Sequence, residues 1–264
     1  MAELWKRIGT VNINGREFES PPFSFAFSLD FVSSYAPAQG ELTIKNPSDE
    51  TVQAAEKQGN EFPRCTITAG HENDSGLVFL GQITQSESKW EGVDKNLKLK
   101  LMDNANLWNF STVSLSFSTP VRASQIIQAI LAKVGVTGAQ IRPANDKTFD
   151  TYAVNTTFRN AMIQLAKETG SDFFSRQGQI YFRSPTASDT AEAIVLQPEE
   201  IIGTIEKTDS GVKGKTLFNH RFAPGVFVDA TEARRNPGIY RVQKCKMVWS
   251  DEGDANVEWE GRAA

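Results

Sequence analysis

Few residues in this chain of 264 could hold a metal or a cofactor, and they are widely spaced. The histidines and cysteines are His71, His220, Cys65 and Cys245. A structural zinc site needs four such ligands in closely spaced pairs, and no two of these residues have that spacing. His71 is followed by Glu72 and Asp74, which could bind a cation in a loop, although a solvated turn is the simpler interpretation. We therefore predict no metal site and no cofactor.

Nucleophilic or acid–base catalysis has only weak signals. Ser86-x-x-Lys89 and Ser210-x-x-Lys213 match a short motif of β-lactamase-like acylases, but the accompanying Ser-Asp-Asn and Lys-Thr-Gly are missing. Neither copy opens a recognisable helix. The adjacent carboxylates Glu199 and Glu200 would point to opposite faces of a strand, which makes them a poor acid–base pair. We predict that the protein is not an enzyme and has no catalytic residues.

Composition excludes several functional classes. Lys and Arg number 28 against 32 Asp and Glu, so a basic surface for nucleic acid is not expected. No stretch approaches the ~20 consecutive apolar residues of a membrane span, and we expect no membrane anchoring. The first residues lack the basic and apolar regions of a secretory signal. In a chain made in the cytoplasm, Cys65 and Cys245 are most simply reduced and buried, with a disulfide as the alternative.

The elements that must position any site are mostly strands over residues 1–110. Asn14-Gly15 favours a type I′ turn in a hairpin over residues 11–18. The large side chains from Phe23 to Leu29 alternate with small ones and share one face. A short helix is expected over residues 48–57. Further strands are expected at 41–45, 66–69, 77–83 and 96–102, where the last places Leu97, Leu99 and Leu101 opposite Lys98 and Lys100. Such a series of short antiparallel strands predicts a barrel or a sandwich.

Helical spacing appears only in the middle of the chain, after a strand at 113–117. Apolar residues from Ile126 to Val134 predict a helix that Gly135 ends. A second helix is expected to begin at Asn155 or Thr156 and to end at Gly170. A hairpin over residues 173–182 follows. We predict a small α+β domain over residues 111–188, with a linker at 184–191.

The last part, residues 189–264, returns to β character. Strands are expected at 194–196, 201–205, 215–218, 226–228, 239–242 and 247–249. Charge is uneven: residues 189–206 hold five acids and no base, and 213–246 hold eight bases against two acids. These stripes are either solvated faces of strands or surfaces that meet opposite charges on a neighbouring subunit. The candidate interface charges are Glu199, Glu200, Arg234 and Arg235.

Several segments resemble, in their order, the tail hub (baseplate hub) proteins of bacteriophages, a family whose fold is shared by the base of type VI secretion spikes. The N-terminal segments that carry the resemblance are residues 41–46 (ELTIKN), 67–71 (ITAGH), 78–83 (VFLGQI) and 97–103 (LKLKLMD). The C-terminal ones are 217–219 (LFN), 222–225 (FAPG), 238–242 (GIYRV), 251–253 (DEG) and 259–261 (WEG). His71 stands where the family usually has Tyr.

The resemblance implies a β-rich α+β fold. Two tail-tube-like antiparallel β-barrels, over residues 1–110 and 189–264, would flank the small α+β domain. It implies a homotrimer whose six barrels match the hexameric tail tube on one side and the threefold central spike on the other. The implied partners are a tail tube or distal tail protein, central spike or baseplate proteins and a tape-measure protein. DNA would pass through the channel, whose acidic lumen would repel phosphate. The implied location is the tip or baseplate of the phage tail, assembled in the host cytoplasm.

Other interpretations remain open. Another tail component with the same barrel, such as a tube or distal adaptor protein, would share these segments. A β-rich ligand- or glycan-binding module, or an enzyme, would not assemble into a ring. A hub is expected as a trimer of 29.2 kDa chains, whereas a monomer that binds sugar or turns over an acyl substrate would favour these alternatives.

Overall fold

The computed structural model describes residues 6–57, 59, 61–187 and 193–264. Its first part consists of strands and one short helix: β1 (Arg7–Ile13), β2 (Arg16–Ser20), β3 (Phe25–Val32), β4 (Gln39–Lys45), α1 (Asp49–Ala54), β5 (Arg64–His71), β6 (Asp74–Glu91) and β7 (Asp94–Met102). Asn14 and Gly15 have positive φ between β1 and β2, which confirms the predicted turn. The hydroxyl of Ser48 accepts from the Thr51 amide and so begins α1. Phe23 was expected on the buried face of β3, but it precedes the strand and is 45% exposed.

The middle of the chain contains the longer helices, as predicted. Its elements are α2 (Ala105–Phe110), β8 (Thr112–Phe117), β9 (Val121–Arg122), α3 (Ala123–Lys133), β10 (Ala139–Arg142), β11 (Thr148–Phe149), β12 (Tyr152–Thr157), α4 (Phe158–Thr169), β13 (Asp172–Arg176) and β14 (Gln179–Arg183). The N-cap of α4 is Thr157, whose hydroxyl accepts from the Asn160 amide. The predicted caps, Asn155 and Thr156, were therefore wrong, because both belong to β12. The sequence did not predict α2.

The last part is again mostly strands: β15 (Ile194–Val195), the 3-10 turn η1 (Pro198–Glu200), β16 (Glu206–Thr208), β17 (Gly211–Leu217), β18 (Phe227–Asp229), β19 (Ile239–Ser250) and β20 (Asn256–Ala263). The strand predicted at 201–205 was wrong, since only Ile201 makes an isolated bridge, to Thr216. The two strands predicted at 239–242 and 247–249 are one strand, β19. A register shift between Val242 and Lys244 interrupts its pairing with β20.

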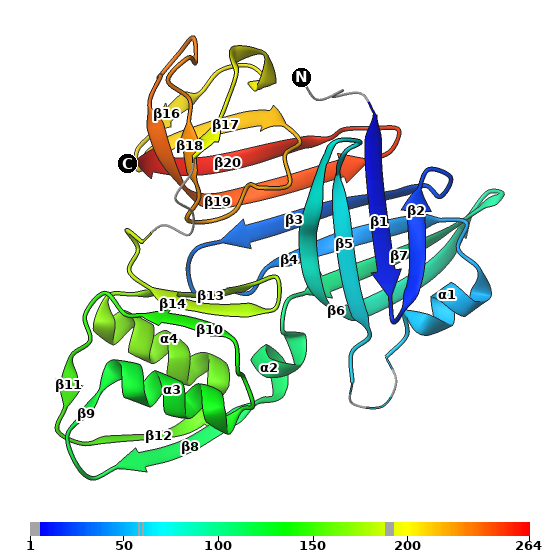
Figure 1. The fold of residues 1–264 in the computed structure, drawn as a ribbon. Helices are drawn as coiled ribbons and strands as arrows, with labels where there is room; N and C mark the ends of the chain where they lie inside the picture. The colour runs from blue at the N-terminus through cyan, green and yellow to red at the C-terminus, as the bar shows by residue number, and fades with distance from the viewer. Residues whose placement is uncertain (1–5, 58, 60, 188–192) are drawn as a thin grey trace.

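Strands from the two ends of the chain join in a single large sheet (Figure 1). Its hydrogen-bonded order is β16-β17-β20-β19-β3-β4-β7-β6-β5-β1-β2, with β15 and β18 attached beside β19. The antiparallel pair β3–β19 connects the N-terminal and C-terminal strands. Among the described residues this order does not return to its start. The fold is therefore β-rich with large antiparallel sheets, and the two separate closed barrels that were expected are not seen in it.

One hydrophobic core lies under both halves of this sheet. Trp249, from β19, stacks on Phe27 with ring centroids 5.6 Å apart and lies 4.9 Å from Phe25. All three side chains are at most 3% exposed. The pairing of β3 with β19 thus brings apolar residues from both ends of the sequence into contact. Cys65 and Cys245 are both buried and free, as expected for reduced thiols.

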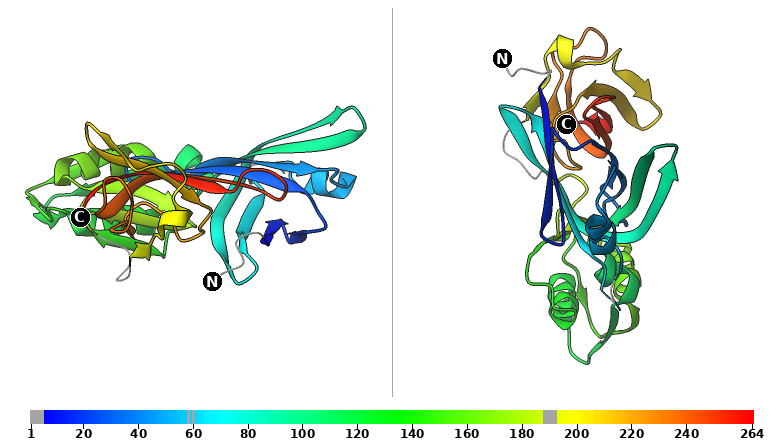
Figure 2. Two further views of the ribbon diagram at one scale, coloured as in Figure 1. Left: turned by 90° about the horizontal axis from the view of Figure 1, so that it is seen from above. Right: turned by 90° about the vertical axis from the view of Figure 1, so that its right-hand side faces the viewer.

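The middle of the chain has a second core, around α3 and α4. Phe158, on α4, packs edge-to-face on Phe173 of β13. Figures 1 and 2 show this small unit beside the large sheet rather than within it. The segment before β4 attaches it, because the amide of Ala38 donates to the Ser175 carbonyl at 3.0 Å. The exact boundaries predicted for the three domains stay predictions, and residues 188–191 of the predicted linker lie outside the described residues.

Candidate assembly surface

Charged side chains form regular rows across the outer face of the C-terminal strands. In the first row Glu206, on β16, faces Lys213 on β17, which faces Glu260 on β20, which faces Lys244 on β19. The Lys213–Glu206 and Lys244–Glu260 ion pairs measure 2.9 and 3.1 Å. Every neighbour in this row therefore has the opposite charge, which favours antiparallel pairing in this register.

A second row runs parallel to the first. It consists of Lys215, Glu258, Lys246 and Asp30, on β17, β20, β19 and β3. Lys215 Nζ lies 3.0 Å from a carboxylate oxygen of Glu258. We call these eight residues the charge ladder. The ladder joins a strand from the start of the chain to strands from its end.

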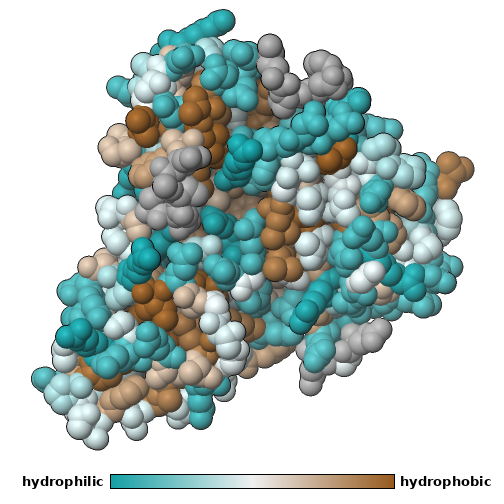
Figure 3. Space-filling model, viewed as in Figure 1, coloured by the Kyte–Doolittle hydropathy of each residue, from teal (hydrophilic) through white to brown (hydrophobic). Residues whose placement is uncertain are grey.

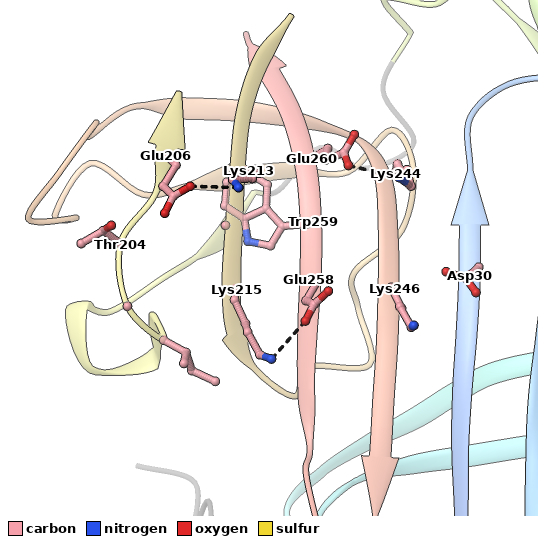
Figure 4. Close-up of a pocket in the computed structure, with 13 residues that line it drawn as sticks. Asp30, Thr204, Glu206, Lys213, Lys215, Lys244, Lys246, Glu258, Trp259 and Glu260 are labelled. Atoms are coloured by element: carbon pink, nitrogen blue, oxygen red, sulfur yellow. Dashed lines mark hydrogen bonds and ion pairs between the residues drawn. The ribbon is translucent and has the colours of Figure 1, made fainter. Parts of the chain in front are cut away.

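The charge ladder surrounds a shallow hollow of about 450 Å³ (Figure 4). Ile202 and Thr204, from the segment before β16, bound it on one side. The Lys213 ammonium donates a hydrogen bond to Glu206, which lowers the pKa of that carboxyl and raises the pKa of the ammonium. Both groups stay charged near neutral pH. The hollow thus presents fixed charges of both signs, an arrangement suited to a polar surface of a neighbouring protein.

The polar face continues beyond the charge ladder. Glu41 on β4 is opposite Lys100 on β7, and Lys98 on β7 is opposite Glu87 on β6. Figure 3 shows hydrophilic side chains over most of the face in view, with hydrophobic ones in separate groups. The two charged segments that are separate in the sequence are therefore interleaved in space. The acids Asp189 and Glu192 of the first segment lie outside the described residues.

The predicted interface charges lie close to this hollow but not within it. Arg234 and Arg235 line a second hollow of about 290 Å³, together with Pro198 and Ile205. Glu199 and Glu200 belong to η1, so the expected strand geometry, with the two on opposite faces, was wrong. Glu200 accepts from the Gln197 amide at 2.9 Å and caps that turn. The role of these four residues at a subunit interface stays a prediction.

The structure places the weak catalytic motifs on strands and turns. Ser86 and Lys89 lie on β6, where Lys89 is paired with Glu87. Lys213 is held by Glu206, three residues beyond Ser210 in the turn before β17. Within the described ranges, no group of three His, Cys, Asp or Glu side chains could hold a metal ion. No helix of the described chain is long and apolar enough to cross a membrane.

The two histidines, distant in sequence, lie near one carboxylate. His71 pairs with Asp74 across the β5–β6 turn, and His220 Nδ1 lies 3.8 Å from Asp74 Oδ1. Arg221 donates to the same oxygen at 2.6 Å. Burial lowers the pKa of both histidines, although Asp74 opposes that effect. The sequence analysis missed this cluster because residues 218–221 reach the β5–β6 turn only through the pairing of the two halves of the chain.

Asp103 is a second titratable group that the sequence analysis did not single out. It is completely buried at the end of β7, where its oxygens accept from the Gly178 amide at 3.1 and 3.3 Å. Burial raises its pKa to about 7, against hydrogen bonds from Gly178, Ser175 and Asn104 that lower it. Gly178 belongs to the turn between β13 and β14. Asp103 therefore connects the large sheet with the small unit.

The sequence matches no family model, and no curated protein matches it either. The structure, in contrast, is similar to solved structures over nearly its whole length. A tail protein from Neisseria meningitidis MC58 has a TM-score of 0.68 at 9% identity, covering 97% of this chain and 96% of that one. The 43 kDa tail protein of prophage MuSo2 from Shewanella oneidensis has a TM-score of 0.68 at 9% identity, covering 97% and 98%.

A component of a type VI secretion system has the same fold. The Escherichia coli c3393 protein has a TM-score of 0.67 at 11% identity, covering 96% of this chain and 76% of that one. Its description notes similarity to the T4 tail proteins gp27 and gp5. The chain therefore has the fold of phage tail proteins and of this secretion component, as the sequence resemblance predicted.

Proposed function

We propose, from the fold shared with phage tail proteins, that this protein is a structural, non-enzymatic subunit of a tail or tail-like particle, specifically its hub. The observation that carries the proposal is the likeness to two tail proteins over 97% of this chain and almost all of theirs. The secretion component with the same fold supports a place at the base of a spike. In this role the protein would belong to the tail tip or baseplate of a virion and assemble in the host cytoplasm.

The hub role further assigns two tube-like units to each chain, one from β1–β7 and one from β15–β20. Three chains would then present six such units to a hexameric tube and three to a central spike. The pairing of β3 with β19 supports this arrangement, because it holds the two strand groups in a fixed relation within one sheet. A ring needs heterologous contacts, in which one surface of a chain meets a different surface of the next.

The charge ladder supports a polar surface in this assembly. It has four acids and four lysines, so it would attract DNA phosphate much less than a basic surface does. This balance replaces the acidic lumen expected from the sequence as the reason for free passage of DNA. Glu199, Glu200, Arg234 and Arg235 would lie at the contact between subunits. The proposed neighbours are a tube or distal tail protein, spike or baseplate proteins and a tape-measure protein.

The oligomeric state of the purified chain tests the proposal. Light scattering should give three chains of 29.2 kDa, or 87.6 kDa, and negative-stain images should show a ring with an open centre. Arg234→Glu with Arg235→Glu should weaken the ring, most strongly at low salt, because salt screens exposed charges. Lys207→Glu, in the exposed strand β16, is the control for a reversed charge. A hexamer would favour a tube or adaptor protein, and a monomer that gains no mass with tube protein would refute the hub.

A further inference from the structure

The tip of the hairpin formed by β6 and β7 extends beyond the rest of the sheet. The two strands pair out to Glu91 and Asp94, whereas β4 follows β7 only as far as Asn96. At this tip Trp90 is 69% exposed and Val93 is 90% exposed. Figure 2 shows the arm projecting from the molecule, and Figure 3 shows hydrophobic side chains at its end. An exposed tryptophan on a projecting arm is typical of a residue that is buried on association.

A hollow of about 450 Å³ lies at the other end of β6, where the large sheet meets α2 and α3. We call it the α2 pocket and define it by Arg64, Leu80, Asn104, Asn106, Leu107 and Val136. Leu80, Leu107 and Val136 form apolar walls, and the exposed Arg64 stands at the solvent side. Its volume is sufficient for one large aromatic side chain.

The α2 pocket also contains buried amide groups that lack a protein partner. Among the described residues, neither Asn104 Nδ2 nor Asn106 Oδ1 has a hydrogen-bond partner, although both atoms are buried. The Asn106 backbone is fixed, because its amide donates to Gln82 Oε1 at 3.0 Å. A buried acceptor without a donor is costly, so the pocket should favour a ligand that is apolar and also carries an N–H group. The indole of tryptophan has both properties.

The arm tip fits these requirements. The indole N–H of Trp90 could donate to Asn106 Oδ1, while its rings cover the apolar walls. Glu91 and Asp94 beside it are acidic and would face Arg64. The arm cannot reach the pocket of its own chain, because Trp90 lies eight residues along β6 from Gln82, about 26 Å at the usual strand rise. The matching arm must therefore come from another copy.

We propose that Trp90 of one chain inserts into the α2 pocket of a second copy of this chain. The contact is heterologous, since the arm and the pocket are different surfaces, and repetition of it closes a ring. The inference rests on the proposed function only in that the ring is a trimer. Each chain then contributes one arm and one pocket to the ring.

Two variants separate the arm from the pocket. Trp90→Ala removes the arm's anchor but leaves the pocket intact. Leu80→Glu places a carboxylate in the wall of the pocket, at a side chain that is only half-buried, but leaves the arm intact. Phe23→Ala is the control for Trp90→Ala, since Phe23 is an exposed aromatic residue elsewhere. Arg64→Glu is a second, milder pocket variant at an exposed position. Circular dichroism and thermal unfolding verify that each variant is folded.

Sedimentation velocity of the full chain gives the readout. Wild type and Phe23→Ala should sediment as 87.6 kDa rings, and Trp90→Ala and Leu80→Glu alone as 29.2 kDa monomers, with association weakened by about 30-fold or more. A mixture of these two variants should form a 58.4 kDa dimer and nothing larger, because only one arm and one pocket in each pair are functional. Arg64→Glu should weaken the ring less than Leu80→Glu.

The remaining outcomes overturn the inference. If Trp90→Ala forms rings as the wild type does, the arm is not the contact, while the proposed hub survives. If both variants are monomers but their mixture yields no dimer, the arm and pocket do not meet each other. If Leu80→Glu alone assembles normally, the pocket receives another tail protein or nothing. A wild type that is monomeric at every concentration and shows no pairing in the mixture refutes both the ring and the inference.

Discussion

Replacing Asp103 by asparagine measures the cost of burying a carboxylate where the large sheet meets the small unit. Asp103 is fully buried, and its two oxygens accept from the Gly178 amide in the β13–β14 turn. Burial raises its pKa to about 7 from 3.8, although Gly178, Ser175 and Asn104 donate to it. Asparagine resembles the protonated acid, because it has one oxygen that accepts and one group that donates. The substitution therefore removes the titration and keeps most of the shape.

The raised pKa determines the sign of the pH dependence. Between pH 3.8 and about 7 the folded chain holds a proton that the unfolded chain releases. The contribution of Asp103 to stability is therefore fully present below pH 3.8 and is lost as pH rises through about 7. At 1.36 kcal/mol for each pKa unit, the whole change is about 4 kcal/mol. Between pH 5 and pH 8 it is about 2–3 kcal/mol.

Urea unfolding of wild type and Asp103→Asn at pH 5, 6, 7 and 8 measures this change. The free energy of unfolding of the wild type should fall relative to that of the variant by about 2–3 kcal/mol from pH 5 to pH 8. The difference between the two proteins cancels the titration of every other group, including the histidines. Asp209→Asn, in the exposed turn before β17, is the matched control. A difference that is constant, or that has the opposite slope, would show that hydrogen bonds to the carboxylate outweigh its burial.

Three further predictions concern the core, the charge ladder and the histidine cluster. Trp249→Ala, which removes a fully buried ring stacked on Phe27, should lower the free energy of unfolding by about 3–5 kcal/mol in urea titrations. A double-mutant cycle on Lys215 and Glu258 should give a coupling of about 0.2–1 kcal/mol that decreases at 1 M NaCl, since both side chains are partly exposed. Burial lowers the pKa of His220, so its neutral form favours folding, and stability should fall as pH drops below 6.5; His220→Gln should make that fall shallower in thermal scans from pH 7.5 to pH 5.

Local patterns predicted the elements that depend on local chemistry. The Asn14-Gly15 turn, the strand with Leu97, Leu99 and Leu101 inside, and the end of α4 at Gly170 are all as expected. Each depends on side chains within a few residues, where periodicity and turn preference act. The segment 201–205 misled the prediction because its apolar residues, Ile201, Ile202 and Ile205, have strand-like composition. Its backbone instead passes over the edge of the sheet, where it makes a single bridge.

Long-range pairing is the part that the sequence could not supply. Nothing near Phe27 indicates that Trp249 will stack on it, since the contact follows from the pairing of β3 with β19. The same pairing brings His220 to Asp74 and Asp30 to Lys246. The buried position of Asp103 depends on the β13–β14 turn, 75 residues later. In each case the chemistry of the residue is local, but its surroundings come from topology.

The charge ladder shows why blocks of charge in a β-rich sequence are weak evidence for charged patches. In a helix, a run of like charges can form one face, but an antiparallel sheet places each residue opposite one from a different strand. Here the bases of 213–246 lie opposite the acids of 251–260, and the ion pairs of Lys215 and Lys244 join the two segments. Because opposite charges are already satisfied within one chain, this face offers a neighbour little net attraction. Specific assembly would then depend on features that are unsatisfied in the single chain, and the exposed Trp90 and the buried amides of the α2 pocket are such features.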